Sequence, residues 1–188
     1  MPRAPVVPPP EGLVFTPDLL SPGEEAALLR IVDGLDYDPI EIRGVVARRT
    51  ARHYGVGYDY ATRTAQPGAL PIPEWLEDLR ARGAGLAGLP PEELAEALVQ
   101  RYPPGATIGW HRDAPAFEVV VGVSLASACR LRFQRGRGDA RRVAEVALPA
   151  RSAYVLTGPA RWSWEHSIPP TPALRYSITF RTLRRARA

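Results

Sequence analysis

Short β-rich runs separated by turn residues fill the second half of the chain, and they constrain its fold more than any other feature. From residue 98 onward the runs are TIGWHRD, EVVVGVSL, CRLRFQR, RRVAEVAL, SAYVLTG and ALRYSITFRTLR, separated by Gly, Pro or Asp. Regularly spaced runs of this kind predict about eight strands arranged as a sandwich or a barrel. The 188 residues are enough for one domain with a sizeable core.

The first half of the chain carries helix signals instead. Ser21 and Glu24 have the spacing of a capping box, and Leu28 and Val32 then recur at helical spacing before Gly34. Two further segments are expected to be helical: residues 72–82 and 90–100.

This order of elements predicts an α+β fold, in which N-terminal helices brace a double-stranded β-helix, or jelly roll. Residues 1–12 are rich in proline and are expected to form a flexible lead. We assign residues 13–188 to a single domain, with an irregular segment over 40–70 and the jelly-roll core over 98–184.

Composition limits the partners and the cellular compartment that we expect for the protein. All 24 basic residues are arginine, and the net charge of +4 permits a polyanionic partner without requiring one. No apolar run is long enough to span a membrane, and the single cysteine, Cys129, excludes an internal disulfide. We expect a cytoplasmic monomer with no membrane partner and no secretory signal.

Histidine and aspartate form a candidate metal site. His111 and Asp113 stand two apart in a predicted strand, so their side chains point to the same face. His166 lies in a distant predicted strand. Two imidazoles and a carboxylate form the facial triad of non-haem iron(II) oxygenases, which leaves metal positions open on one side. His-x-Asp pairs alone are common, and most of them bind no metal.

The last predicted strand supports the metal site. Alternation along LRYSITFR puts four polar residues on one face: Arg175, Ser177, Thr179 and Arg181. Two guanidiniums on an interior face are costly unless anions pair with them. The gap between them matches about the length of a five-carbon diacid. An edge strand with solvated arginines is the alternative.

Three segments carry a resemblance to a known family. RYPPGATIGWHRD, SAYVLTGPARWSWEHSIP and LRYSITFR, in this order, resemble the AlkB family of iron(II)- and 2-oxoglutarate-dependent dioxygenases. The likeness extends from RRTARHYG, near residues 48–55, through Arg181. It implies that His111, Asp113 and His166 bind iron(II).

The resemblance also implies a cosubstrate site. Arg175 and Arg181 would hold the two carboxylates of 2-oxoglutarate, with Arg181 nearer the metal. Tyr102 would donate to a cosubstrate carboxylate. Ser177 and Gln100 stand where many family members have asparagine, and both can still form hydrogen bonds.

The activity implied is oxidation by O2, coupled to decarboxylation of 2-oxoglutarate. Hydroxylation of an N-methyl group gives a hemiaminal that releases formaldehyde, so we expect oxidative demethylation of alkylated nucleic acid. A hydroxylase or demethylase of protein or modified RNA is one alternative. A catalytically inactive nucleic-acid-binding barrel is another, and it is disfavoured because all three metal ligands and both arginines are present.

The segment before the barrel forms a base-reading lid in this family. Here Tyr54, Tyr58 and Tyr60, with Arg52 among the neighbouring arginines, would bind the substrate base. Packing of the tyrosines on the core is the alternative. Pro115 stands where DNA-repair members often carry an acid, which weakens the case for base repair and leaves RNA and protein substrates open.

Other aromatic and polar residues have simpler expected roles. Trp162 and Trp164 alternate with His166 in a predicted strand, and we expect both in the barrel core. His53 is expected to be a polar lid residue without a role, and Cys129 a small core residue.

Overall fold

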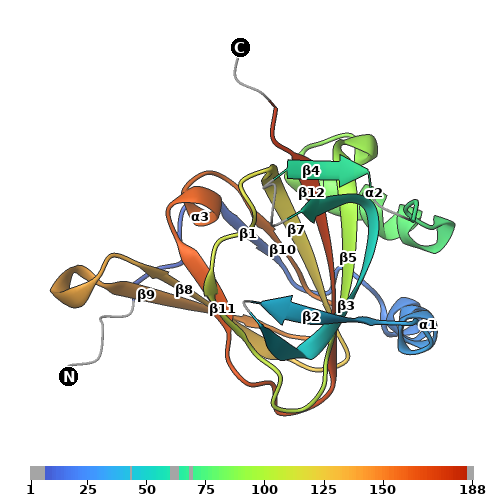
Figure 1. Ribbon diagram of the computed structural model, residues 1–188, viewed down its shortest axis with the longest axis horizontal. Coiled ribbons are helices and arrows are strands. Elements are labelled where there is room, and N and C mark those ends of the chain that lie inside the picture. Colours follow the sequence, from blue (N-terminus) through green and yellow to red (C-terminus); the bar gives the residue numbers. More distant parts are fainter. Residues whose placement is uncertain (1–6, 43, 60–63, 68–69, 186–188) are drawn as a thin grey trace.

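Two antiparallel sheets pack face to face in the computed structural model, which describes residues 7–42, 44–59, 64–67 and 70–185 (Figure 1). The major sheet has the order β1-β10-β7-β12-β5-β3-β2, with β4 paired to β3, and the minor sheet has the order β6-β11-β8-β9. The strands of the major sheet are β1 (Leu13–Thr16), β2 (Asp38–Ile42), β3 (Val45–Asp59), β4 (Thr64–Pro67), β5 (Leu94–Tyr102), β7 (Phe117–Leu125), β10 (Ala153–Leu156) and β12 (Arg175–Leu183). Those of the minor sheet are β6 (Ile108–His111), β8 (Cys129–Arg135), β9 (Arg142–Leu148) and β11 (Glu165–Ile168). The predicted jelly roll is confirmed.

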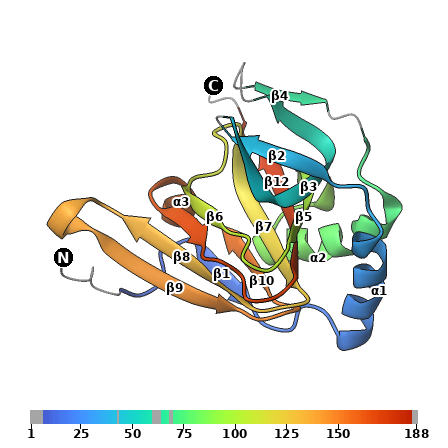
Figure 2. The same cartoon turned by 60° about the horizontal axis from the view of Figure 1, so that its bottom comes forward.

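The helices cover the outer face of the major sheet (Figure 2). They are α1 (Pro22–Asp33) and α2 (Glu77–Ala87), while α3 (Gly158–Trp162) is a short helix before β11. Single 3-10 turns lie at Glu74–Leu76, Pro91–Glu93 and Gly138–Ala140. The predicted capping box begins α1: the Glu24 backbone N–H donates to Ser21 Oγ at 3.3 Å, and the Ser21 N–H donates to Glu24 Oε2 at 2.7 Å. The helix predicted over 72–82 exists, but α2 begins later and ends before Gly88, whose φ is +67°.

Each face of the major sheet has its own buried cluster. Tyr176, Ile178 and Phe180 of β12 pack under the helices on the outer face. On the inner face, Val120 and Leu156 pack with Leu131, Phe133 and Cys129 of the minor sheet and with Trp164, which directly precedes β11. The period-2 alternation of β12 is therefore confirmed, and its polar face lies between the two sheets. Trp164 and Cys129 are core residues, as predicted.

The helix predicted over residues 90–100 is wrong. Only Pro91–Glu93 forms a turn, and residues from Leu94 onward form β5, which pairs with β12 on one side and β3 on the other. The segment contains good helix formers, but a strand in the middle of a sheet gains hydrogen bonds and packing on both faces. These tertiary contacts exceed the small differences in helix propensity.

The expectation of an irregular segment over residues 40–70 is also wrong. β3 (15 residues) runs through about half of it and pairs with β5 from Thr50↔Arg101 to Gly55↔Glu96, and its far end pairs with β4. Arginine, threonine and tyrosine alternate there on a partly exposed strand, so no continuous apolar run marks it. What looked like a loop is part of the major sheet.

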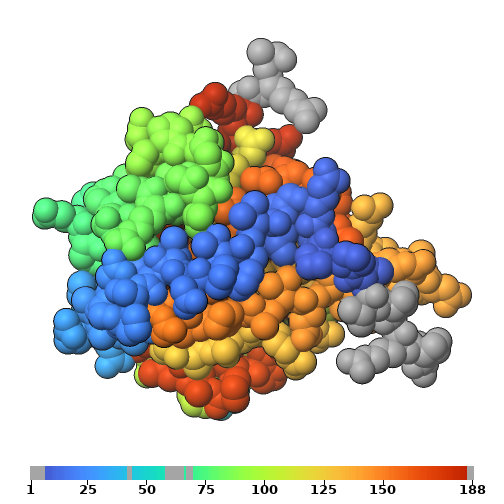
Figure 3. Space-filling view, turned by 180° about the vertical axis from the view of Figure 1, so that it is seen from behind, coloured from blue at the N-terminus to red at the C-terminus, as the bar shows by residue number. Residues whose placement is uncertain are grey.

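The proline-rich lead is bound to the fold over its described part, residues 7–12. The Val7 N–H donates to the Val143 carbonyl at 2.9 Å, and the Thr157 N–H donates to the Gly12 carbonyl at 2.9 Å. Gly12 has a φ of +85°, and a Cβ there would lie 2.2 Å from the Thr157 oxygen, so only glycine fits. Figure 3 shows the blue N-terminal segment lying across the back of the molecule. The remainder of the predicted lead lies outside the described residues.

Candidate iron and cosubstrate site

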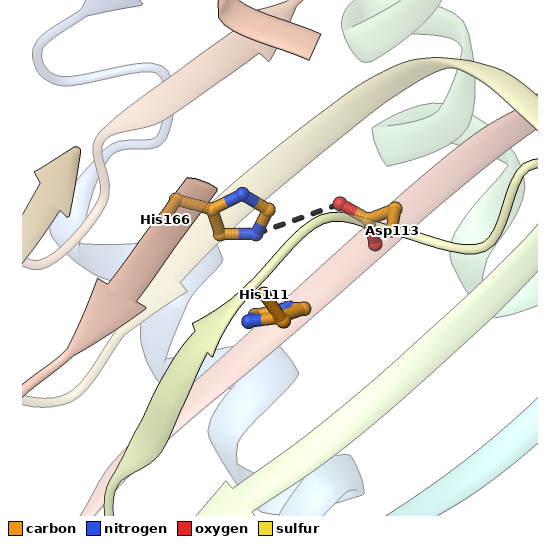
Figure 4. Close-up of side chains that lie close together, drawn as sticks. All are labelled: His111, Asp113 and His166. Carbon is orange, nitrogen blue, oxygen red and sulfur yellow. Dashed lines mark ion pairs between the residues drawn. The ribbon is translucent and has the colours of Figure 1, made fainter. Parts of the chain in front are cut away.

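The structure brings the three predicted metal ligands together. His111 ends β6, Asp113 follows in the next loop, and His166 lies in β11, directly across from His111. One ligand atom from each residue lies within 4.8 Å of the other two, and the imidazole centroids are 4.3 Å apart (Figure 4). The pairing of β6 with β11 thus closes the gap between ligands that are distant in sequence.

The protonation states of the triad suit a metal ion. Burial lowers the pKa of His166 to about 4, so its imidazole is neutral at pH 7. Burial alone would raise the pKa of Asp113, but the nearby positive groups, of which Arg181 contributes most, together outweigh it and hold that pKa well below its usual range. The 3.5 Å contact between His166 Nε2 and Asp113 Oδ2 is therefore not an ion pair at pH 7. Asp113 Oδ2 is buried without a hydrogen-bond partner, as an oxygen that binds a metal would be.

The geometry of His111 also leaves a nitrogen for the metal. Its Nδ1 lies 2.9 Å from the Gly109 carbonyl, which can only accept a hydrogen bond. The proton is therefore on Nδ1, and Nε2 keeps the lone pair that a metal requires.

Arg181 lies at the metal end of β12, as predicted. Its Nη2 is 2.7 Å from Asp113 Oδ1, and its Nη1 is 2.6 Å from Glu96 Oε2. Glu96 is almost fully buried on β5, opposite Arg181 in the register. Two protein carboxylates therefore neutralise this guanidinium, and only its buried Nε has no partner. Sequence reasoning missed Glu96, because its role depends on β5 being a strand.

No described carboxylate neutralises the guanidinium of Arg175 in this way. Its side chain is only 1% exposed, its Nε donates to Ser124 Oγ at 3.0 Å, and its Cζ lies 5.0 Å from the Tyr102 ring centroid. Its Nη1 is buried without a hydrogen-bond partner, and no described carboxylate lies within ion-pair distance. An unpaired buried guanidinium is costly, so this end of the site fits a carboxylate of 2-oxoglutarate.

The other predicted cosubstrate residues lie between or beside the two arginines. Ser177 is buried midway along the inner face of β12 and pairs with Gln100 in the register. Gln100 Oε1 accepts hydrogen bonds from Tyr102 Oη and from Arg49 Nε, both at 3.2 Å. Arg49 was expected only among the arginines near the substrate tyrosines, and its contact with Gln100 was not predicted. The alternation of residues along β3 could have placed Arg49 on the inner face, but this segment was expected to be irregular.

Two of the predicted substrate residues point away from the site. Tyr54 is 7% exposed and packs edge-on against Trp75 under the helices, with ring centroids 6.3 Å apart. Arg52 alternates onto the same outer face and lies 3.7 Å from Asp38. Their assignment to base binding is therefore wrong, because the pleat of β3 turns them toward the helices. Tyr60 and the side chain of Tyr58 lie outside the described residues.

His53, unlike Tyr54 and Arg52, lies on the side of β3 that faces the site. It lies on the inner face of β3, and its Nδ1 is 3.6 Å from Glu96 Oε1. About half of its side chain is exposed (53%), so it reaches the surface near the metal end. His53 therefore contacts a residue that holds Arg181, and the expectation that it has no role stays a prediction.

We expect Tyr54→Ala to lower the stability of the fold rather than substrate affinity. Loss of a buried aromatic side chain costs about 3–5 kcal/mol, whereas Tyr54→Phe keeps the ring and should cost far less. The melting temperature, the 2-oxoglutarate KM and the substrate KM of both variants check this. A raised substrate KM with an unchanged melting temperature would contradict the core assignment.

Trp162 does not share a strand with His166, contrary to the sequence prediction. It ends α3, and the chain turns through Ser163 before β11 begins at Glu165. Its ring is only half-buried, and two arginine guanidiniums lie over it.

The sequence family described as the 2OG-Fe(II) oxygenase superfamily matches residues 12–181. The chain belongs to this superfamily and is an AlkB-like member of it. It is therefore a 2-oxoglutarate-dependent dioxygenase, with iron(II) as its metal and O2 and 2-oxoglutarate as cosubstrates. The donor set fits this, since the triad can hold iron(II) and the inner face of β12 can hold a dicarboxylate.

Individual relatives support the same family. The chain is 30% identical, over 85% of its length, to tRNA (carboxymethyluridine(34)-5-O)-methyltransferase ALKBH8 of Macaca fascicularis, and it covers 24% of that protein. It is 30% identical, over 84% of its length, to the Arabidopsis thaliana alkylated DNA repair protein ALKBH8 homolog, and it covers 51% of it. The chain thus spans about a quarter and about half of these relatives.

Solved structures show the same fold. The structure of OsALKBH1 superposes with a TM-score of 0.72 at 17% identity, covering 91% of this chain and 96% of that one. Among the described residues, no helix is long and apolar enough to cross a membrane.

Proposed function

We propose that this dioxygenase oxidatively demethylates alkylated nucleic acid. The observation that carries the proposal is the likeness, at 30% identity, to two proteins whose names specify tRNA and alkylated DNA. The site supports it in one respect. The cosubstrate end is sealed by Arg175 and Tyr102, while the metal end reaches the surface beside His53, where a base flipped out of its strand could enter.

Some residues of the chain would hold the cosubstrate, and others would orient the metal ligand Asp113. When bound, iron(II) couples the decarboxylation of 2-oxoglutarate by O2 to oxidation of a substrate C–H bond. Arg175 would hold the distal carboxylate of the cosubstrate. Arg181 keeps Asp113 ionised and in place, and Glu96 in turn fixes Arg181. Apolar residues of the inner cluster, such as Leu131 and Phe133, would keep water from the reacting atoms.

A second candidate is hydroxylation of a modified RNA without loss of a carbon. The macaque relative is named for a modified uridine of tRNA, which favours this candidate over a protein substrate. The two reactions differ in their products, because demethylation releases formaldehyde and hydroxylation leaves an added oxygen on the nucleoside.

The experiment supplies iron(II), 2-oxoglutarate and O2 to the enzyme with pools of methylated single-stranded DNA, double-stranded DNA, RNA, modified tRNA and peptides. Mass spectrometry and a formaldehyde assay read the products, with Asp113→Ala as the inactive control. We expect loss of methyl groups from a nucleic acid pool, with formaldehyde released in equal amount. Oxygen addition to RNA without formaldehyde would support the second candidate, and oxidation of peptides alone would contradict both.

A further inference from the structure

Arginines gather around Trp162 at one side of the metal site. The Arg161 and Arg184 guanidinium carbons lie 4.2 and 5.0 Å from the Trp162 ring centroid, and Arg112 Nη1 donates to the Trp162 carbonyl at 3.5 Å. We call Arg112, Arg161, Trp162 and Arg184 the Trp162 cluster. Its members come from three separate segments: the loop after β6, α3, and the end of β12. An aromatic face holds such guanidiniums in place through cation–π contacts.

The Trp162 cluster surrounds the loop that carries Asp113. Arg112 stands between the two ligands His111 and Asp113. Arg161 Nη2 donates to the carbonyl oxygens of Asp113, Ala114 and Phe117 at 3.2, 2.8 and 2.7 Å. The Arg184 backbone N–H donates to the Ala116 carbonyl at 2.7 Å. The cluster therefore lies directly against the loop that carries Asp113.

Some surface arginines of the described chain pair with carboxylates. Arg82 pairs with Glu24 and Asp78, and Arg185 pairs with Glu93. Arg112 and Arg184 are exposed, and neither has an ion pair with a carboxylate of the described chain.

The like charges oppose one another within the cluster. Burial lowers the pKa of Arg161, and the nearby Arg181, Arg112 and Arg184 lower it further, against the attraction of Asp113. Arg161 is fully buried, and its Nε and Nη1 have no hydrogen-bond partner. Three cations held together at the edge of a metal site, two of them exposed, create a local positive field that an anionic ligand would relieve.

We infer that Arg112 and Arg184 bind backbone phosphate of a nucleic-acid strand, next to the nucleotide whose base reaches the iron. The inference rests on the proposed function and names the surface that positions its substrate. Guanidiniums bind phosphate bidentately, and every nucleotide carries a phosphate whatever its base. Arg161 and Trp162 act as the support, because they orient the two exposed arginines and connect them to the Asp113 loop. Binding at this surface is independent of base sequence and sensitive to salt.

The test is the binding of a labelled single-stranded oligonucleotide, measured by fluorescence anisotropy over a range of salt concentrations. Arg112→Gln and Arg184→Gln should each weaken binding about fivefold at low salt, equally for oligonucleotides of different sequence. Each should also reduce the slope of log Kd against log salt by about 0.7, the value for one lost phosphate contact on a single strand. The thermal shift produced by 2-oxoglutarate verifies that each variant is folded.

Arg30→Gln is the matched control, because it removes the same charge from the exposed surface of α1. It should leave affinity and salt slope as in the parent protein. If the parent binds and both cluster variants keep its slope, the inference fails while the proposed function stands. If the parent binds no nucleic acid at all, the proposed function fails and the inference fails with it. Polyglutamate that competes as well as an oligonucleotide of equal charge would show an acidic peptide site and overturn the inference.

Discussion

Asp113→Ala is expected to abolish iron binding and succinate production while the chain remains folded. Asp113 is the only anionic member of the triad, and Arg181 keeps it ionised. Mutating even an outer partner of a metal ligand costs 10- to 100-fold in affinity or activity, so removing the ligand itself should weaken iron binding by more than about 100-fold. The fold should survive because Arg181 still pairs with the buried Glu96.

Anaerobic titration with iron(II) and the rate of 2-oxoglutarate decarboxylation measure the two losses. A melting curve of the metal-free protein reports the fold. Asp139→Ala, which removes an exposed carboxylate from the turn between β8 and β9, is the control and should change neither property. Decarboxylation at the parental rate by Asp113→Ala would show that the triad does not hold the metal.

Arg175→Met is expected to remove cosubstrate binding without destabilising the metal-free protein. A charge-assisted hydrogen bond contributes about 1.5–3 kcal/mol, so the KM for 2-oxoglutarate should rise roughly 10- to 150-fold. The buried guanidinium has no carboxylate partner among the residues that the structure describes. Its replacement by an apolar side chain of similar length should therefore change the free energy of unfolding by less than about 1 kcal/mol.

Arg181→Met makes the same chemical change at the other end of β12 and should behave differently. It would break two ion pairs and leave the buried Glu96 with only the half-exposed His53 beside it, at a cost of about 3–5 kcal/mol. Arg175→Lys keeps the charge but loses the planar fork, so its KM should lie between those of the parent and Arg175→Met. The measurements are melting temperature with and without 2-oxoglutarate, and the KM for decarboxylation. Equal destabilisation of the metal-free protein by both methionine variants, with an unchanged KM for Arg175→Met, would place the cosubstrate elsewhere.

The wrong assignments at residues 40–70 and 90–100 have one physical cause. Residues such as Glu92, Glu93 and Ala95 favour a helix locally, and nothing near them in sequence reveals that β3 and β12 lie on either side. The expected positions of Tyr54 and Arg52 depended on this error. Once a segment is taken as a lid, its aromatic residues are expected to face substrate, whereas in a strand alternate residues face opposite sides.

The sequence by itself determined the chemistry of this protein and the strands that carry it. His111, Asp113 and His166 were identifiable because the chain has only three histidines and the ligand pair shares one face of a strand. Arg175 and Arg181 were identifiable because period-2 alternation is a local property. Only the tertiary structure decided which arginine is compensated, since Glu96 and Asp113 reach Arg181 from β5 and from the β6–β7 loop. The same holds for Arg49, His53 and the Trp162 cluster, whose contacts join segments far apart in the chain. The pairing of strands brings these segments together, and it leaves no pattern in the sequence of any single strand.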